Sequence, residues 1–345
     1  MPSARTIGEN CFKKCSTALN SVSLPLATYI ADYAFNNCTH LTSVSFAAVE
    51  SLGIGCFSGS TSITTVSMPA LLHANDSCFD GLTGATSYNL PLLRVAGNRC
   101  FAFNTHLVSI TLASIIGLGD YCFQNCTLLT TVNVVTLSGA GNGCFKGCVG
   151  LTSIVDMPLV ALYSNELYAG CTHLTSVSDT YGVVTYLGDY CFSGCTALTT
   201  AVFQECHAVG NSCFYNCTSL GTVDLTKCLN LGSTSGNTTV FLNVKSPFHL
   251  TIRTSLTNAP DGDILYLQTS KVLTLTKTGI NALILNFYDP LGVVSGTTYW
   301  NTFFDLPANG SPFTGSTVVG TQVQLFGGKN IIAKDNLFYN NQQIS

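Results

Sequence analysis

Charged residues are scarce in this sequence. They make up only 9% of its 345 positions, against roughly a quarter in typical soluble proteins. The net charge is −4, and the thirteen basic residues form no cluster or stripe. Because nucleic acids and anionic membrane surfaces are recognised through concentrated positive charge, the sequence predicts no nucleic-acid partner. Neutral polar residues must supply most of the surface polarity.

Long apolar runs are also missing. No stretch reaches the roughly 18 consecutive apolar residues of a membrane span, so we expect no membrane insertion. Residues 1–10 contain one large aliphatic residue after Met1, which is Ile7, and so lack the apolar core of a secretory signal. We expect a mature or trimmed secreted protein that is extracellular or at the cell surface. The alternative is a protein that leaves its cell inside a virion.

Enzyme signatures are absent as well. A nucleophilic cysteine requires a nearby base and an orienting group. Three of the six histidines, His40, His106 and His173, share one repeat position in a Thr-His-Leu turn, which is typical of a solvated surface feature. The other histidines and the carboxylates have no partners set by spacing. We therefore predict that the protein is not an enzyme and has neither catalytic residues nor a cofactor.

A repeat of about 22 residues fills the first two thirds of the chain. Its landmark is an aromatic residue next to cysteine, and the intervals between successive landmarks are 22 to 24 residues. Such self-similarity is typical of a solenoid, in which each unit buries its apolar side against its neighbours. The landmark residues are Phe12, Phe35, Phe57, Phe79, Phe101, Phe123, Phe145, Tyr168, Phe192 and Phe214.

Each unit contains a strand signal followed by a glycine-marked return. In the unit that begins at Cys126, inward Val132 and Val134 alternate with outward Asn133, which indicates a short half-buried strand. A glycine recurs before seven of the ten aromatic residues, and we expect it to form a tight bend with positive φ. A return turn then places the aromatic ring in the core. The recurring glycines are Gly8, Gly53, Gly97, Gly119, Gly141, Gly188 and Gly210.

The pattern resembles the BspA-like, treponemal-type leucine-rich repeats. Their L-x-x-I-x-L-P strand segment is matched at Leu24-Pro25 and Leu90-Pro91, and their I-G-x-x-A-F-x-x-C return segment is matched from Leu118 to Cys126. The likeness covers about residues 7–225. In eight units, cysteine stands where the family usually has alanine. The resemblance implies a solenoid of short parallel strands and a binding function, because members are commonly surface or secreted adhesion proteins.

We therefore predict a leucine-rich repeat solenoid of about ten 22-residue units over residues 1–228. A β-rich C-terminal region, residues 229–345, follows as a cap or a separate module. The strand-like runs of this region are residues 240–244, 249–253, 264–268, 272–276 and 282–288. The aromatic residues that could fill its core or line its binding loops are Trp300, Phe303, Phe304, Phe313, Phe326, Phe338 and Tyr339.

The seventeen cysteines fall mainly into two repeat positions, one immediately before the aromatic residue and one three residues after it. The C-x3-C spacing lacks histidines at zinc-ligand offsets, so we predict no metal site. Disulfides between neighbouring units would span about 4.8 Å, which geometry permits. In-register side chains point the same way, however, and the count is odd. We favour reduced thiols that pack as small apolar groups, and leave the disulfide alternative open.

The outward positions of the strands carry short polar residues. One column holds a hydroxyl residue in all ten units, and a second runs through Asn133, Val155 and Ser178. Short hydroxyls either solvate a sheet and form cross-strand ladders or offer an uncharged hydrogen-bonding platform. On the second interpretation, we predict a recognition or adhesion protein that binds a host or cell-surface protein or glycan. The candidate binding residues are Ser87, Ser109, Thr111, Thr131, Asn133, Ser153 and Ser176.

A second hypothesis is a structural or receptor-binding component of a virion or phage tail appendage. It follows from the thiol-rich interior, the low charge and the lack of a signal sequence. Its partners would be other structural protein subunits. The sequence leaves both hypotheses open.

Overall fold

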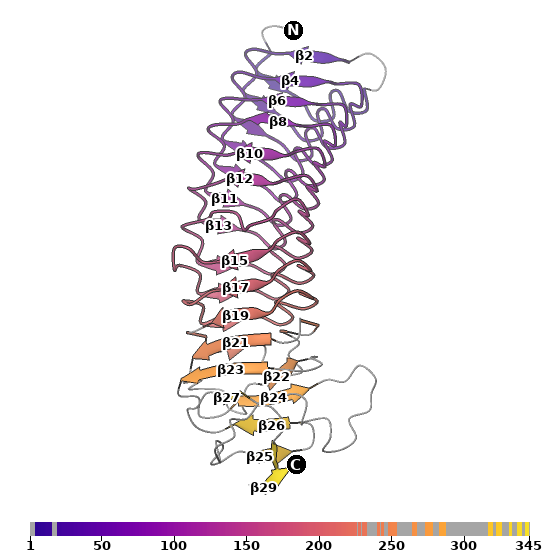
Figure 1. Ribbon diagram of the computed structural model, residues 1–345. Helices are drawn as coiled ribbons and strands as arrows, with labels where there is room; N and C mark the ends of the chain where they lie inside the picture. Colours follow the sequence, from indigo (N-terminus) through magenta and orange to yellow (C-terminus); the bar gives the residue numbers. More distant parts are fainter. Residues whose placement is uncertain are drawn as a thin grey trace. The chain divides into compact units, whose positions relative to one another are not determined.

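The computed structural model describes residues 4–15, 19–225, 227–228, 230–232, 240–241 and 243–244, and the backbone of the strands between 248 and 344 (Figure 1). Within these residues the regular structure is β-strand alone, and no described helix has the length and apolar character needed to span a bilayer. The chain divides into two compact units. Unit 1 is Met1–Val160 with Glu166–Leu174, and unit 2 is Ala161–Asn165 with Thr175–Ser345.

Unit 1 is a parallel coil in which most turns contribute two short strands. The even-numbered strands carry the alternating pattern predicted from the sequence and follow one another along one face (Figure 1). They pair in parallel as β2-β4-β6-β8 and β10-β12. The even strands are β2 (Ser21–Ser23), β4 (Ser43–Ser45), β6 (Thr65–Ser67), β8 (Ser87–Asn89), β10 (Ser109–Thr111) and β12 (Thr131–Asn133).

The odd-numbered strands of unit 1 form a second parallel sheet of seven strands in sequence order. Each is two residues long and precedes the turn that carries the aromatic residue. These strands are β1 (Thr6–Ile7), β3 (Tyr29–Ile30), β5 (Ser51–Leu52), β7 (His73–Ala74), β9 (Val95–Ala96), β11 (Gly117–Leu118) and β13 (Gly139–Ala140).

Unit 2 begins with the same alternation of two strands per turn. One parallel sheet has the order β14-β16-β18-β20, and the other runs β15-β17-β19-β21-β23 with β27 antiparallel at its edge. These strands are β14 (Leu162–Tyr163), β15 (Ser176–Ser178), β16 (Tyr186–Leu187), β17 (Thr200–Val202), β18 (Ala208–Val209), β19 (Thr222–Leu225), β20 (Asn230–Leu231), β21 (Phe248–Arg253), β23 (Leu273–Thr278) and β27 (Ile331–Ile332).

Two smaller sheets complete the described backbone of unit 2. One has the order β22-β24-β26-β25, and the other is the antiparallel pair β28-β29. Their strands are β22 (Ile264–Leu267), β24 (Leu283–Phe287), β25 (Thr317–Val319), β26 (Gln322–Leu325), β28 (Leu337–Tyr339) and β29 (Gln342–Ile344).

The aromatic landmarks stack in the core, as predicted. Phe123 is fully buried, with its ring centroid 5.0 Å from Phe101 and 5.7 Å from Phe145 and the rings nearly parallel. Rings at this spacing and tilt gain favourable stacking in addition to burial. In unit 2, Phe241 lies 5.5 Å from Phe214, which extends the ladder by one ring beyond the ten landmarks. The sequence and the structure therefore share one core register.

Parallel pairing also continues beyond residue 228, through β19-β21 and β21-β23. The boundary at residues 228/229 between solenoid and C-terminal region stays a prediction. Residues 240–244, predicted as a strand, were wrongly assigned, because Val240, Phe241 and Asn243 lie in turns. Val240 instead accepts a backbone hydrogen bond from Phe214 of the preceding turn. Of the seven aromatic residues predicted to fill the core or line loops of this region, Phe338 and Tyr339 fall on a described strand, and the other five lie outside the described residues.

The predicted reason for the recurring glycines was wrong. Gly53, Gly119 and their equivalents do not have positive φ; that conformation occurs two and six residues later, for example at Gly55 and Gly59. Six of the seven recurring glycines are required by close approach between turns, whereas a Cβ on Gly8 would meet nothing within 4 Å. A Cβ on Gly119 would lie 2.5 Å from the backbone nitrogen of Asn98 in the preceding turn. Any side chain there would push neighbouring turns apart.

The second outward column was also misassigned at one position. Val155 is buried, and Asp156 pairs with Asn133 in its place. Met157 comes six positions after Leu151, whereas Val134 comes five positions after Leu129, so this turn holds one extra residue. An extra residue moves every later side chain to the opposite side of the strand.

Tyr168 accommodates that extra residue. It occupies the landmark position that phenylalanine holds in the other nine units. The backbone N–H of Val155 donates to its hydroxyl at 3.2 Å. A phenylalanine ring would leave this buried N–H without its acceptor. The irregular turn and the irregular landmark residue are therefore linked.

Candidate functional site

Five of the six candidate binding residues of unit 1 lie on the even strands β8, β10 and β12 (Figure 1). Ser109 pairs in register with Thr131, and Thr111 pairs with Asn133. All four are exposed, and so is Ser87 on β8. Because the inward residues of these strands are fixed by the core, alternation forces the four side chains outward. Neighbouring strands then place like groups about 4.8 Å apart.

Two further candidates lie elsewhere. Ser153 is exposed but belongs to a bend rather than a strand, because of the extra residue in its turn. Ser176 is exposed on β15 of unit 2. We define the hydroxyl face as the six candidates of unit 1, namely Ser87, Ser109, Thr111, Thr131, Asn133 and Ser153.

The polar groups of the hydroxyl face have no side-chain hydrogen bond to any described residue. The neighbouring threonine column differs. The Thr64 hydroxyl donates to the Thr42 carbonyl at 3.3 Å, and the Thr130 hydroxyl donates to the Val108 carbonyl at 3.1 Å. Threonines of that column are thus used to join consecutive turns. The hydroxyl face keeps its hydrogen-bonding capacity for water or a ligand.

The face is also uncharged. The outward positions of the even strands from β2 to β12 are serine, threonine or asparagine. Association with such a surface depends on hydrogen bonds and close fit rather than on long-range attraction between charges. A neutral polar partner suits it best.

A half-buried tyrosine lies on the inner side of the face. Tyr88 takes the inward position of β8, where the other even strands of unit 1 have valine or isoleucine. Its ring packs edge-on against Phe79 and Phe101, with centroids 5.6 and 5.2 Å away, and its hydroxyl donates to Asn104 Oδ1 at 2.5 Å. Burial raises the pKa of Tyr88 well above its ordinary value. These contacts fix β8 against the core.

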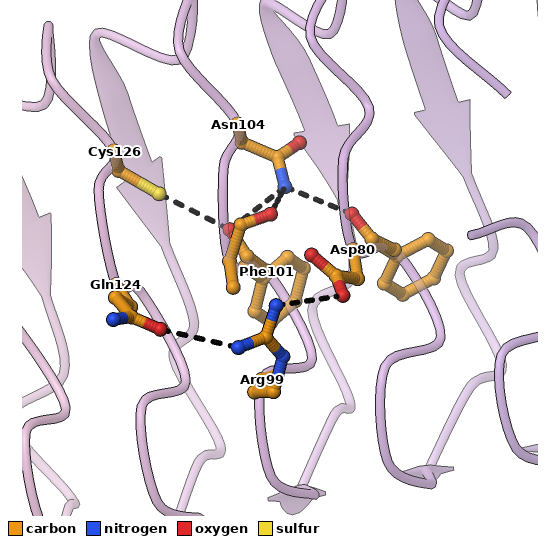
Figure 2. A network of polar contacts seen from close by, with 8 residues as sticks. Asp80, Arg99, Phe101, Asn104, Gln124 and Cys126 are labelled. Carbon is orange, nitrogen blue, oxygen red and sulfur yellow. Dashed lines mark hydrogen bonds and ion pairs between the residues drawn. The ribbon is translucent and has the colours of Figure 1, made fainter. Parts of the chain in front are cut away.

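The second cysteine column, three residues after each aromatic residue, has a role that the sequence did not predict. We call it the donor column. Its side chains donate hydrogen bonds to the carbonyl of the aromatic residue one turn earlier (Figure 2). Cys126 Sγ donates to the Phe101 carbonyl at 3.1 Å, and Asn104 Nδ2 donates to the Phe79 carbonyl at 2.8 Å. Ser60, in the same column, donates to the Phe35 carbonyl at 2.8 Å. In two turns this position holds serine or asparagine in place of cysteine, and both are hydrogen-bond donors. This pattern in the sequence could have indicated the role.

An arginine links three successive turns beside this column (Figure 2). Arg99 lies 3.4 Å from the Asp80 carboxylate and donates to Gln124 Oε1 at 3.3 Å. Its guanidinium also lies over the Phe103 ring, 5.3 Å from the centroid. Asp80 is nevertheless largely desolvated, and this burial raises its pKa despite the neighbouring Arg99. The group joins the turns of the coil and carries no chemistry of its own.

The cysteines lack the surroundings of nucleophiles. All seventeen are free thiols, and fifteen of them are buried. Burial raises the pKa of Cys148 well above its ordinary range, and that of Cys171 to about 12. Such thiols stay protonated and inert at neutral pH. Within the residues described, no group of three or more metal-ligating side chains is close enough to hold an ion.

The repeated histidines serve the turns. His173 Nδ1 donates to the Val149 carbonyl at 2.6 Å, and His106 makes the equivalent contact with the Thr83 carbonyl. Both side chains are exposed. Each histidine fixes its own turn to the preceding one, and neither is placed beside a thiol in the described hydrogen bonds.

Comparison with known proteins identifies the repeat. Six copies of the BspA type leucine rich repeat region match residues 5–130, 73–175 and 138–261. A leucine-rich repeat protein from Bacteroides ovatus shares the fold, with a TM-score of 0.57 and 18% identity over 74% of this chain and 78% of that chain. No curated protein matches the sequence.

Two other solved structures are similar over comparable lengths. A leucine rich cell surface protein from Faecalibacterium prausnitzii has a TM-score of 0.34 and 16% identity, over 67% of this chain and 83% of that chain. The pneumococcal vaccine antigen PcpA has a TM-score of 0.40 and 14% identity, over 79% of this chain and 74% of that chain.

The family assignment rests on the matched repeats, which cover more than half of the chain. Leucine-rich repeat proteins generally mediate protein binding, and their solenoid is generally a non-enzymatic binding scaffold. Those of the BspA type are typically surface or binding proteins. The chain belongs to the BspA-type leucine-rich repeat family.

Proposed function

We propose that this protein is a non-enzymatic recognition or adhesion protein whose hydroxyl face binds a protein or neutral glycan of a host or cell surface. The ligand would lie along β8, β10 and β12 and exchange hydrogen bonds with the outward side chains. Ser176, which is exposed on β15, stays a separate predicted binding residue of unit 2. The proposed location is extracellular or at the cell surface, as the family resemblance implies.

One observation carries the proposal. Two neighbouring columns of unit 1 carry short hydroxyl residues, and their side chains differ in the hydrogen bonds that they make. The threonine hydroxyls of one column donate hydrogen bonds to backbone carbonyls of the preceding turn. The six residues of the hydroxyl face have no such partner among the described residues. Polar groups held in a fixed array without internal partners are available to a ligand at little conformational cost.

The alternative role, in a virion or tail appendage with other structural subunits as partners, remains a prediction from composition. No feature of the described residues favours it over surface recognition. We therefore design the test around the hydroxyl face.

The test replaces Ser109, Thr111, Thr131 and Ser153 with lysine in the full chain. Long charged side chains would block close approach and remove short hydrogen-bonding groups. The parent and variant proteins are applied to one printed array of neutral glycans and extracellular matrix proteins. We expect the parent to bind at least one class of spot and the variant to lose at least ten-fold in apparent affinity.

A matched control carries lysine at Tyr29, His73 and Val95. These are exposed outward residues of β3, β7 and β9 on the other sheet of unit 1. The control should bind like the parent. Equal binding by the hydroxyl-face variant and the parent, with matching melting curves, would rule out the hydroxyl face as the binding surface.

A further inference from the structure

One tripeptide occurs at the same position of three turns. Asn-Cys-Thr begins at Asn37 and Asn125 in unit 1 and at Asn216 in unit 2. Asparagine followed two residues later by serine or threonine, with no proline between, is the acceptor motif for N-linked oligosaccharides. Motif matches of this kind occur by chance, so the surroundings of each asparagine decide whether it could serve as an acceptor.

The backbone presents the motif in one conformation each time. The φ angles of the three asparagines are 57°, 57° and 58°, in the left-handed region. In other turns glycine fills this position, as at Gly59, which has the same sign of φ. Glycine would satisfy the backbone without any side chain. Asparagine is therefore tolerated here, and the backbone does not demand it.

The cysteine of the motif is buried, whereas the asparagine and threonine on either side of it lie at the surface. Cys38 and Cys126 are buried and donate to the carbonyls of Phe12 and Phe101 in the preceding turns. With the cysteine held inward, the flanking residues lie at the surface. Asn37 and Thr39 are exposed, and Asn125 and Thr127 are half-buried at the rim of the turn.

The orientation of the amides also fits an acceptor. The Asn125 amide oxygen lies against Gly147 of the next turn, where a Cβ would collide with it. Asn125 Nδ2 has no hydrogen-bond partner among the described residues. Asn37 has the same relation to Gly59, and its Nδ2 donates only to the neighbouring side chain of Asn36, at 2.8 Å. The nitrogen that would carry the sugar is thus the outer atom of both amides.

We propose that Asn37, Asn125 and Asn216 carry N-linked oligosaccharides. The donor would be an oligosaccharide on a lipid diphosphate. A bond forms between the asparagine Nδ2 and C1 of the sugar while the bond from C1 to the diphosphate oxygen breaks. The lipid diphosphate leaves with the bonding pair, and the amide releases one proton. The inference rests on the proposed extracellular location, because the chain must enter a secretory route.

The thiol-rich core is compatible with that route. Burial raises the pKa of Cys38, the middle residue of the first motif. The thiolate is the form that reacts in disulfide exchange. A folded core that covers fifteen of the seventeen cysteines limits cross-linking in an oxidising compartment.

The experiment uses the full chain secreted from a eukaryotic host behind a cleavable leader. Intact mass is measured before and after treatment with peptide-N-glycosidase, and peptide mapping then scores conversion of asparagine to aspartate. We expect glycan at all three asparagines. Thr39→Ala and Thr127→Ala should each remove one glycan, whereas Thr39→Ser should keep it.

Thr61→Ala is the matched control. Thr61 occupies the repeat position of Thr39, but glycine replaces the asparagine two residues earlier, so the glycan pattern should not change. Secreted, folded protein without glycan at any of the three asparagines would overturn the inference. Array binding is measured on the same preparation. Glycosylated protein that fails to bind would count against the proposed function alone, and unglycosylated protein that binds would count against this inference alone.

Discussion

The interior and the even-strand surface of unit 1 repeat with the same regularity but differ in how their side chains are used. Inside, each ring of the aromatic column stacks on its neighbours, and the donor column reaches the carbonyl one turn earlier. Outside, the residues of the hydroxyl face have no side-chain hydrogen bond to a described residue. A repeated residue type is therefore no guide to its role until its partners are known.

The largest effect should come from the aromatic column. Phe123→Ala would remove a fully buried ring between Phe101 and Phe145. Loss of buried area together with the cavity left behind should lower the free energy of unfolding by about 3–5 kcal/mol. Urea titration of the parent and the variant measures this difference. A loss below about 1 kcal/mol would contradict the core register.

Alkaline pH should weaken the interior next. Burial raises the pKa of Cys148 well above 9.0 and that of Cys171 to about 12, whereas an unfolded thiol ionises near 9. Between pH 9 and 12 the unfolded chain therefore binds fewer protons than the folded chain. The free energy of unfolding falls as the pH rises through this range and keeps its full value below pH 9. The slope is about 1.4 kcal/mol per pH unit for each such thiol.

Urea unfolding at pH 8 and pH 10 gives the measurement. Cys171→Val serves as the comparison, because it removes one buried thiol and should flatten the pH dependence by the contribution of that thiol. An unfolding midpoint that does not move between the two pH values would show that the thiols are not held protonated by burial.

Removal of a hydrogen-bond donor from the donor column should lower the stability by a smaller amount. Cys148 Sγ donates to the Phe123 carbonyl at 3.0 Å. Cys148→Ala removes the donor and some buried volume, so we expect a loss of about 1–2 kcal/mol. Cys148→Ser keeps a donor, as Ser60 does, and should lose less. Thermal unfolding of both variants tests the order, and a more stable alanine variant would refute the donor role.

The smallest effect on stability should be at the surface. Lysine at Ser109, Thr111 and Thr131 should change the free energy of unfolding by no more than about 0.5 kcal/mol per site, because the three side chains are exposed and make no hydrogen bond to a described residue. Circular dichroism and denaturant titration of this variant give the value. A loss of several kcal/mol would mean that these residues support the fold, which would erase the contrast between interior and surface.

The core and the strand faces were predictable because they follow from periodicity. The regular spacing of Phe101, Phe123 and Phe145 predicted that their rings stack. The alternation of residues around Asn133 predicted the outward columns. The error at Val155 shows the limit of that reasoning. One added residue changes the side that each later side chain faces, and spacing alone does not show where a strand absorbs it.

Other features depend on contacts between turns, which a single unit does not contain. Gly119 is glycine because the backbone at Asn98 comes too close for a Cβ. Cys126 is a donor because the Phe101 carbonyl lies one turn earlier. The hydroxyl face could be located from the sequence, but its lack of partners could be established only once the neighbouring side chains were in place.

The pairing between consecutive turns has a mechanical consequence. The inter-turn hydrogen bonds of unit 1 join residues about one repeat apart, as from Gly53 to Ile30. A force that pulls on the two ends of such a coil would first break the hydrogen bonds of the end turns. The hydrogen bonds of the inner turns would break only after that. Each turn that unwraps would release roughly 70 Å of chain, at about 3.3 Å per extended residue. A surface protein built this way would lengthen in steps under load and rewind from the turns still in place.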